Sequence, residues 1–329
     1  MQISAFLLKR AAQLILVSLI VAFITFWLSS VIPGDFFSTH LLDPSIQKET
    51  VEQLRHRYGL DEPFYVQYMR WLERLGRLDL GHSMFYQRPV SAVVANALAN
   101  TLWIGIPALV LGFGLGIILG AVHAILGKRL PGRLLDVFST IALSLPSLVL
   151  GLAALILAAH TRWFPLGSMN SLANQDAGIW RWAADRLHHL CLPVLCLTIP
   201  VLAYVERIQR AACQGSANEL FTRSARSRGL GNLRLFVHYL VRPGLNPVLS
   251  IAGPMLGGVL SGSLVLEVIF TWPGLGQITY DALFNRDLFL LAGCVMGSSV
   301  LLVLGNLLAD VGLMLLDPRT RSLIRKGPR

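Results

Sequence analysis

The sequence predicts an all-α integral membrane protein with six transmembrane helices and an external helical insertion after the first span. Of its 329 residues 54% are hydrophobic and only 14% are charged, and the mean hydropathy is +0.61. A water-soluble domain cannot bury that much apolar surface. A bilayer core about 30 Å thick needs about 20 mainly apolar helical residues. Six runs meet this need: Ala11–Ile32, Leu98–Leu126, Leu134–His160, Leu190–Ile208, Pro247–Phe270 and Leu288–Leu316.

The first apolar run follows two basic residues, Lys9 and Arg10. Basic residues before an apolar run also open a signal peptide, but this run is long and no small-x-small cleavage site follows it. We therefore expect residues 1–32 to form an N-terminal cytoplasmic end and a retained first span.

Residues 33–97 mix acidic and basic residues, and we expect them to form an external insertion of two short helices. Asp43-Pro44 supplies an N-cap and a first-turn proline for one helix, and Gly59 ends it. Asp61-Glu62-Pro63 opens the other. In that helix aromatic residues and leucines recur at helical spacing, namely Phe64, Tyr68, Trp71, Leu72 and Leu75. The stripe either packs on the spans or forms a docking platform for an external partner.

The formal net charge of +10 would favour nucleic-acid binding in a soluble protein. Here the basic residues instead gather in segments on the side of the membrane that holds both termini. They are Lys9 and Arg10; Lys128, Arg129 and Arg133; Arg207, Arg210, Arg223, Arg226, Arg228, Arg234 and Arg242; and Arg319, Arg321, Arg325, Lys326 and Arg329. The positive-inside rule makes this side cytoplasmic. We therefore expect no nucleic-acid partner, both termini in the cytoplasm, and a basic cytoplasmic tail over residues 317–329.

Residues 98–316 are expected to form a five-helix transmembrane core with a cytoplasmic loop over residues 209–246. Small residues lie four apart in two spans: Gly112, Gly116 and Gly120, and Gly253, Gly257 and Ser261, with Gly258 and Gly262 beside them. Such spacing lets helices approach closely, either for static packing or for a pathway whose helices slide or tilt. Prolines within the spans, among them Pro107 and Pro146, permit kinks.

No enzyme motif is present. HExxH, GxSxG and a dinucleotide fingerprint are all absent. In "GAVHAILGKR", residues 120–129, the glycines are too far apart for a phosphate loop, and Arg129 stands where Ser or Thr would hold magnesium. We therefore expect no catalytic residue and no cofactor on this chain, and if the protein does energised work, ATP must be bound by another subunit.

Metal binding is also not expected. The four cysteines, Cys191, Cys196, Cys213 and Cys294, show no CxxC spacing and behave as small apolar residues. The adjacent pair His188-His189 diverges by about 100° on a helix, which disfavours joint chelation. The acids Glu206, Glu267 and Asp310 lie near span ends, where they are either functional, if deeply buried, or snorkelling to the interface.

The stretch "ELFTRSARSRGLG", residues 219–231, interrupts the apolar pattern. It predicts a short helix over Glu219–Arg228, stopped by Gly229 in a left-handed cap, and a second helical piece around Leu233–Val241 leading to Pro243. The first helix either enters a groove lined by acids on a partner or belongs to a solvated loop attracted to anionic lipid headgroups.

Within this stretch "RSARSRGL", Arg223–Leu230, resembles the "RTARAKGL" segment in permease subunits of ABC importers for peptides and nickel. Importers of the wider class carry Glu-Ala-Ala and, three residues later, Gly. Ala225 and Gly229 match this pattern, whereas Arg223 stands in place of Glu. Glu219 lies upstream, where the peptide branch often has an acid. Pro243 and Gly244 replace an expected Asn and Ala, so the second helix is expected to differ in detail.

Further segments resemble this family in family order. They are "VIPGD" (31–35), "YGLDEPFYVQYMRWL" (58–72), "LDLGHS" (78–83), "NTL" (100–102), "SLPS" (144–147), "LEVIFTWPGLG" (266–276) and "LLDPRTR" (315–321). The resemblance covers nearly the whole chain. It implies half of a type I ABC importer in a bacterial or archaeal plasma membrane, completed by a second homologous permease, one or two ABC ATPase subunits that hold ATP and magnesium, and an external solute-binding protein.

Two groups of site residues follow from the resemblance. The coupling helix seated on the ATPase would use Glu219, Arg223, Ser224, Ala225, Arg226, Gly229 and Leu230. The outer gate or pathway would be shaped by Gly257, Gly258, Ser261, Glu267, Trp272, Pro273, Gly274 and Gly276.

Other functional classes stay open at this stage. An ABC exporter subunit or an ion-coupled carrier is the main rival, although a carrier usually shows buried ionisable groups or inverted repeats. A membrane scaffold that uses the basic loop only to recruit a partner is another. Within the importer reading, small peptides are the favoured cargo, and nickel, opines, oligosaccharides and haem are the alternatives.

Overall fold

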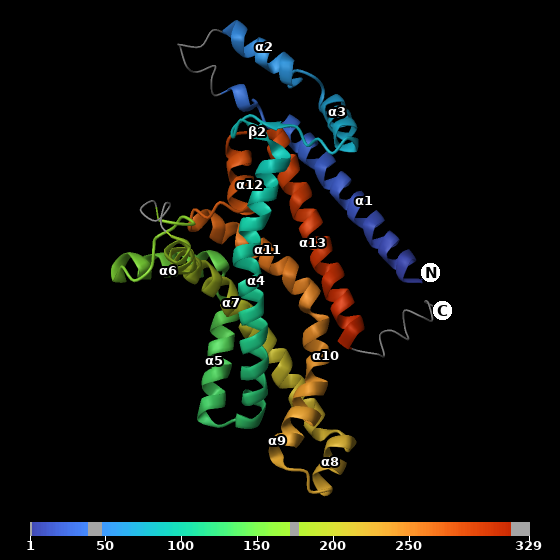
Figure 1. The fold of residues 1–329 in the computed structure, drawn as a ribbon, viewed down its shortest axis with the longest axis vertical. Coiled ribbons are helices and arrows are strands. Elements are labelled where there is room, and N and C mark those ends of the chain that lie inside the picture. The colour runs from blue at the N-terminus through green and yellow to red at the C-terminus, as the bar shows by residue number, and fades with distance from the viewer. Residues whose placement is uncertain (1, 39–47, 172–177, 317–329) are drawn as a thin grey trace. The chain divides into compact units, whose positions relative to one another are not determined.

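The computed structural model describes residues 2–38, 48–171 and 178–316, and it is helical apart from one short hairpin (Figure 1). The described chain divides into two compact units. The first holds Ile3–Thr101 and Pro273–Val303, and the second holds Leu102–Trp272 and the end of the last helix. The long helices α4 (Val90–Leu126) and α13 (Leu288–Leu316) each run from the first unit into the second.

The first unit contains the N-terminal helix, the insertion over residues 33–97 and the segment around α12. Its remaining elements are α1 (Gln2–Val31), the 3-10 turn η1 (Phe36–Ser38), α2 (Lys48–Tyr58), α3 (Phe64–Gly76), β1 (His82–Ser83), β2 (Arg88–Pro89) and α12 (Leu275–Phe284). β1 and β2 pair antiparallel, with His82 opposite Pro89. The two expected helices of the insertion are confirmed as α2 and α3, while Asp43-Pro44 lies outside the described residues. α12 is a helix that the sequence analysis did not predict.

The second unit contains the rest of the spans and the basic loop. Its elements, besides the ends of α4 and α13, are α5 (Leu130–Ser144), α6 (Ser147–Thr161), α7 (Ile179–Asn218), α8 (Leu220–Ser227), α9 (Asn232–Leu235), the π-helix η4 (Phe236–Val241), α10 (Arg242–Ser250) and α11 (Ala252–Ile269).

Among the described residues, five helices are long and apolar enough to cross a membrane, or six spans if one bent pair counts as a single crossing. The bent pair is α5 and α6, whose axes differ by 104°. The continuous span predicted over Leu134–His160 is therefore wrong in geometry. Pro146 supplies the reason, because it has no N–H to donate and keeps the preceding Leu145 extended, at ψ 122°.

The aromatic stripe of α3 packs on α1 within the first unit. Tyr68 and Trp71 are buried, their rings lie 5.7 Å from that of Phe26, and the Tyr68 hydroxyl donates to Leu19 O at 3.1 Å. Burial raises the pKa of Tyr68. Each aromatic pair contributes about 0.5–1.5 kcal/mol beyond area burial. The packing reading of the stripe is thus confirmed for its buried residues.

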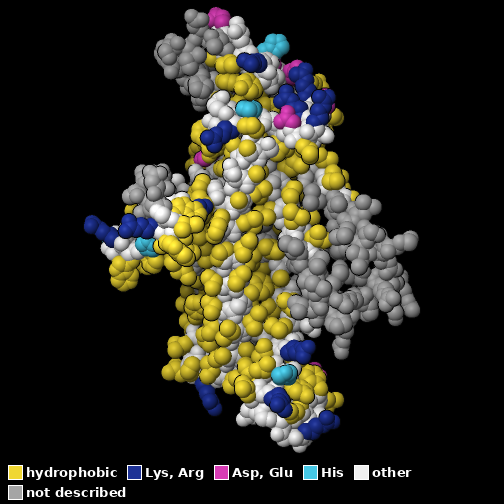
Figure 2. All heavy atoms as spheres, in the orientation of Figure 1, with side chains coloured by type: hydrophobic (Ala, Val, Ile, Leu, Met, Phe, Trp, Pro, Cys, Tyr) yellow, Lys and Arg dark blue, Asp and Glu magenta, His cyan; other side chains and the backbone are white. Residues whose placement is uncertain are grey.

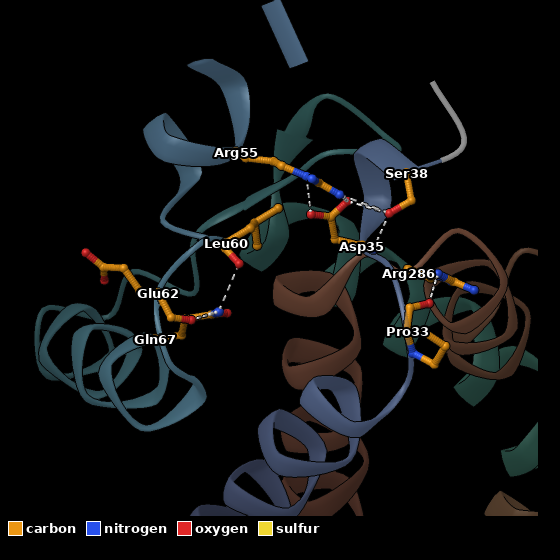
Figure 3. Close-up of polar contacts among 8 residues, drawn as sticks. All are labelled: Pro33, Asp35, Ser38, Arg55, Leu60, Glu62, Gln67 and Arg286. Carbon is orange, nitrogen blue, oxygen red and sulfur yellow. Dashed lines mark hydrogen bonds and ion pairs between the residues drawn. The ribbon is translucent and has the colours of Figure 1, made fainter. Parts of the chain in front are cut away.

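A polar network surrounds the turn after the C-terminal end of α1 (Figure 3). The Arg55 guanidinium of α2 meets both oxygens of Asp35, with Nε 2.7 Å from Oδ2 and Nη2 3.0 Å from Oδ1. Ser38 donates to Asp35 Oδ1 at 2.9 Å, and Arg286 donates to Pro33 O at 2.5 Å. This two-pronged geometry is the stronger form of an arginine–carboxylate pair. It ties the insertion to the turn after the first span.

Asp287 anchors the start of α13 to the hairpin. The residue is buried, and its Oδ1 accepts the N–H of Leu290, as an N-cap does. Its Oδ2 accepts from the Ser83 hydroxyl at 2.7 Å and from the Phe85 N–H at 3.0 Å. A carboxylate with several donors at a helix N-terminus is stable in the interior, so this contact joins two distant parts of the first unit.

The glycines of α4 allow α7 to approach it in the second unit. A Cβ built on Gly112 would lie 2.5 Å from Val201, one on Gly116 2.7 Å from Val205, and one on Gly120 2.5 Å from the Glu206 carbonyl oxygen. No side chain fits at these distances. The small-residue spacing in α4 therefore serves close helix packing, as expected from helix association in lipid.

Candidate coupling site

α8 is a short helix between the end of α7 and Gly229. The Glu219 carbonyl accepts the N–H groups of Thr222 and Arg223, each at 3.1 Å, which starts the helix. Gly229 has φ +76°, and its N–H donates to Arg226 O at 3.0 Å. The predicted helix and its left-handed stop are confirmed in geometry, with α8 one residue shorter at each end than the predicted range.

One face of α8 is held against its own unit. Thr222 and Ala225 are 0% and 4% exposed, and the Thr222 hydroxyl donates to Ser216 O at 2.7 Å. This bond closes the turn between α7 and α8. The orientation of α8 is consequently fixed by the end of α7.

The opposite face presents most of the predicted coupling residues. Glu219, Arg223, Ser224, Arg226 and Gly229 are exposed. Ala225 points inward and Leu230 is half-buried. The predicted set therefore divides into residues that shape the helix and residues that a partner can reach.

Two exposed leucines lie beside these arginines, and the sequence analysis missed them. Leu220 begins α8 and is 80% exposed, and Leu233 in α9 is 77% exposed. Figure 2 shows hydrophobic and basic side chains together over α8 and α9. The sequence did offer a signal for them, namely leucines inside a basic loop. An apolar centre with a charged rim is typical of a protein–protein contact.

The segment after α9 continues as a helix, and side chains of α7 bond to it. The predicted piece over Leu233–Val241 is found as α9 and η4, but the helix goes on through Pro243 and Pro247 in α10. Gln209 Nε2 donates to Val241 O at 3.4 Å and the Cys213 thiol to Leu240 O at 3.6 Å. The π-geometry leaves carbonyls for side chains of α7 to bind, which is how a proline-containing helix remains satisfied.

The residues expected to shape the pathway fall in both units. In the second unit, along α11, Gly257 is half-buried, Gly258 is exposed and Glu267 is buried. Trp272, just after α11, is fully buried. The side chain of Ser261 lies outside the described set. Their exposure separates Gly258 from the buried Glu267 and Trp272, so these positions do not form one exposed surface.

In the first unit the turn before α12 is anchored to α4. Asn100 Nδ2 donates to Pro273 O at 2.8 Å, and the Leu275 N–H donates to Thr101 Oγ1 at 2.8 Å. Gly274 stands at the N-cap of α12 and Gly276 is buried. These contacts give the turn a structural role that the sequence pattern did not reveal.

Within the described residues no group of three His, Cys, Asp or Glu side chains could hold a metal ion. His188 Nε2 lies 2.7 Å from Trp163 O, and His189 Nδ1 lies 2.8 Å from Asp185 O. The two rings thus bond to different backbone carbonyls.

Comparison with known proteins decides the family. The family described as "Binding-protein-dependent transport system inner membrane component" matches residues 112–322, and its N-terminal counterpart, "Binding-prot-dependent transport system membrane comp, N-term", matches residues 3–103. The chain belongs to this inner membrane component family. The two matches cover the insertion, the spans and the basic loop.

Curated relatives of the inner membrane component align over almost their full length. The oligopeptide transport system permease protein AppB of Bacillus subtilis is 33% identical, over 96% of this chain and 99% of that protein. The nickel import system permease protein NikB of Staphylococcus aureus is 28% identical, over 96% and 91%. The glutathione transport system permease protein GsiC of Salmonella paratyphi A is 29% identical, over 96% and 98%.

A solved structure supports the fold. The MetNI methionine ABC transporter in an inward-facing conformation matches 69% of this chain and 97% of the compared chain, with a TM-score of 0.53 and 14% identity. The inner membrane component is therefore a multi-pass permease subunit of an ABC importer with the type I fold. The exporter and ion-coupled carrier readings are not favoured.

Proposed function

We propose that this permease forms half of the pathway for a small peptide and that α8 seats on a partner ATPase. The observation that supports the proposal is the geometry of α8, a short helix held by Thr222 and stopped by Gly229, which presents Arg223 and Arg226 outward. Such a helix fits a groove with acidic walls.

The seat would use charge and apolar contact together. Arg223 and Arg226 would pair with carboxylates of the ATPase, while Leu220 and Leu233 would fill apolar hollows between them. Because α8 is bonded to the end of α7, closure of the ATPases would move α7 with it. The spans would then change their arrangement as packed helices rather than bend continuously.

The cargo is proposed from the relatives. Several are named for peptides, oligopeptides or glutathione, and one for nickel. Because an external binding protein would select the cargo, the permease itself needs only a tolerant pathway. We therefore favour small peptides, with nickel as the second candidate.

The remaining parts of the proposal concern the assembly. A second homologous permease completes the pathway, ATP and magnesium bind only to the ATPase subunits, and both termini face the cytoplasm of a bacterial or archaeal plasma membrane. No cofactor is bound by this chain in this arrangement.

The test is purification of the tagged chain in mild detergent, followed by ATPase assays with binding proteins loaded with a dipeptide, a longer peptide or nickel. We expect a second permease and an ATPase in the eluate, with hydrolysis stimulated by one loaded binding protein. A chain that purifies without an ATPase would contradict the proposal. If only the nickel-loaded binding protein stimulates ATP hydrolysis, the cargo is nickel and not a peptide.

A further inference from the structure

Three polar side chains from three helices of the second unit meet in its interior. His123 of α4, Ser139 of α5 and Glu206 of α7 are 0%, 0% and 1% exposed. His123 Nδ1 lies 2.5 Å from Glu206 Oε1, and the Ser139 hydroxyl donates to Glu206 Oε2 at 2.6 Å. We refer to these three residues as the buried polar cluster. The coupling residues of α8 do not include them.

The chemistry of the cluster is complementary. Each oxygen of Glu206 has its own partner, because Oε1 bonds to the His123 imidazole and Oε2 accepts from the Ser139 hydroxyl. His123 Nε2 is buried and lies 3.7 Å from Asp136 Oδ2, and Asp136 pairs with Arg210. Removal of any one member would leave a buried polar group unsatisfied, which is costly.

The cluster lies at one of the close contacts between α4 and α7. A Cβ on Gly120 would lie 2.5 Å from the Glu206 carbonyl oxygen and 2.8 Å from Gln209 Cβ. The valines of α7 that fill the glycine positions of α4 align these two helices, and the hydrogen bonds to the Glu206 carboxylate add directional contacts that also include α5. From Glu206, α7 runs about three turns to Asn218 and then enters α8.

We infer that His123, Ser139 and Glu206 are positioning residues for transport, which fix the register of α4, α5 and α7 so that movement of α8 displaces the three helices as one body. The inference rests on the proposed seating of α8 on an ATPase. Apolar residues could supply the same stability, since well-packed apolar replacements of a buried ion pair are often neutral or stabilising. Apolar residues would, however, lack the directional contacts that hold α4, α5 and α7 in a single register.

The experiment uses the assembled transporter in proteoliposomes. The main variant, called the apolar variant, replaces all three members, His123→Leu, Ser139→Ala and Glu206→Leu, so that no member of the cluster is left as a buried polar group without a partner. The matched control is Thr198→Val, which removes the bond from a buried hydroxyl of α7 to Ala108 O of α4. Two quantities are measured, the melting temperature of the complex and the amount of cargo imported per ATP hydrolysed.

We expect the transporter with the apolar variant to melt near the parent temperature but to import roughly tenfold less cargo per ATP, on the scale of the coupling measured between contacting residues. Thr198→Val should leave that ratio unchanged. The conservative Glu206→Gln keeps one acceptor for the imidazole and should retain more of the ratio than the apolar variant. A melting temperature alone would not separate these variants, so the ratio carries the test.

A parental ratio of cargo imported to ATP hydrolysed in the transporter with the apolar variant would overturn the inference. If that variant does not assemble, Ser139→Ala removes a single donor with little change in volume, and a parental ratio there would equally overturn it. Failure of the proposed α8 seat looks different, because the unaltered chain would then bind no ATPase and show no coupled hydrolysis.

Discussion

Gly229 has φ +76°, a conformation that residues with a side chain rarely adopt. A Cβ there would meet nothing within 4 Å, so the constraint is the backbone and not space. We predict that Gly229→Val, at a cost of about 1–2 kcal/mol in this conformation, shifts the capped end of α8 and lowers uptake roughly tenfold. The measurement is cargo uptake at matched expression.

The control for that prediction is Gly229→Asn, since asparagine tolerates the left-handed conformation and often replaces glycine at a helix end. Uptake by this variant should stay within about twofold of the parent, a change of less than about 0.5 kcal/mol. Equal uptake by the valine and asparagine variants would mean that the cap does not position α8 for coupling.

Single residues differ in how far the sequence reveals them. The stop at Gly229 and the turn at Gly59, with φ +68°, are local backbone features, and both were predicted from glycine alone. The contact between His123 and Glu206 joins residues 83 positions apart. The sequence marks Glu206 as a candidate acid at a span end, but its two donors come from other helices and are known only once those helices are packed.

At the scale of helices, the α4–α7 contact makes a sharp prediction about two glycines of one helix. A Cβ on Gly116 would lie 2.7 Å from Val205 Cβ and 2.9 Å from Leu202 O, whereas a Cβ on Gly114 would meet nothing within 4 Å. Gly116→Ala should therefore destabilise the chain by about 1–3 kcal/mol through overpacking, and Gly114→Ala should not.

Thermal unfolding of both variants in the same detergent checks this prediction. We expect a lower melting temperature for Gly116→Ala and a parental or slightly higher one for Gly114→Ala, because alanine favours a helix over glycine. Unfolding of membrane proteins is often irreversible, so the two are compared at one scan rate. Equal melting temperatures would show that α4 and α7 do not pack as described.

The prediction of helices from hydropathy succeeded where the axis is straight and failed where it bends. The last span was predicted over the range Leu288–Leu316 that α13 occupies. The run around Pro146 is apolar throughout, so a hydropathy average cannot detect the 104° bend between α5 and α6. Conversely, Pro243 and Pro247 lie inside α10, where neighbouring π-geometry and bonds from α7 keep the helix.

For the whole molecule, the sidedness of every loop depends on whether α5 and α6 together cross the membrane once. If they do, the basic loops around Arg129 and Arg223 lie on the same side, as the positive-inside rule requires. If the pair re-enters and returns, these loops lie on opposite sides. The charge distribution therefore favours a single crossing in spite of the bend.

Labelling of single cysteines in intact cells tests that crossing. In a chain with Cys191→Ser, which removes the exposed native cysteine, we place single cysteines at Leu130 and at Leu166, both exposed. A membrane-impermeant maleimide should label Leu166→Cys in intact cells, while Leu130→Cys should react only after the cells are opened. Like behaviour of Leu130→Cys and Leu166→Cys would instead mean that α5 and α6 re-enter on one side, and the basic loops would then face opposite compartments.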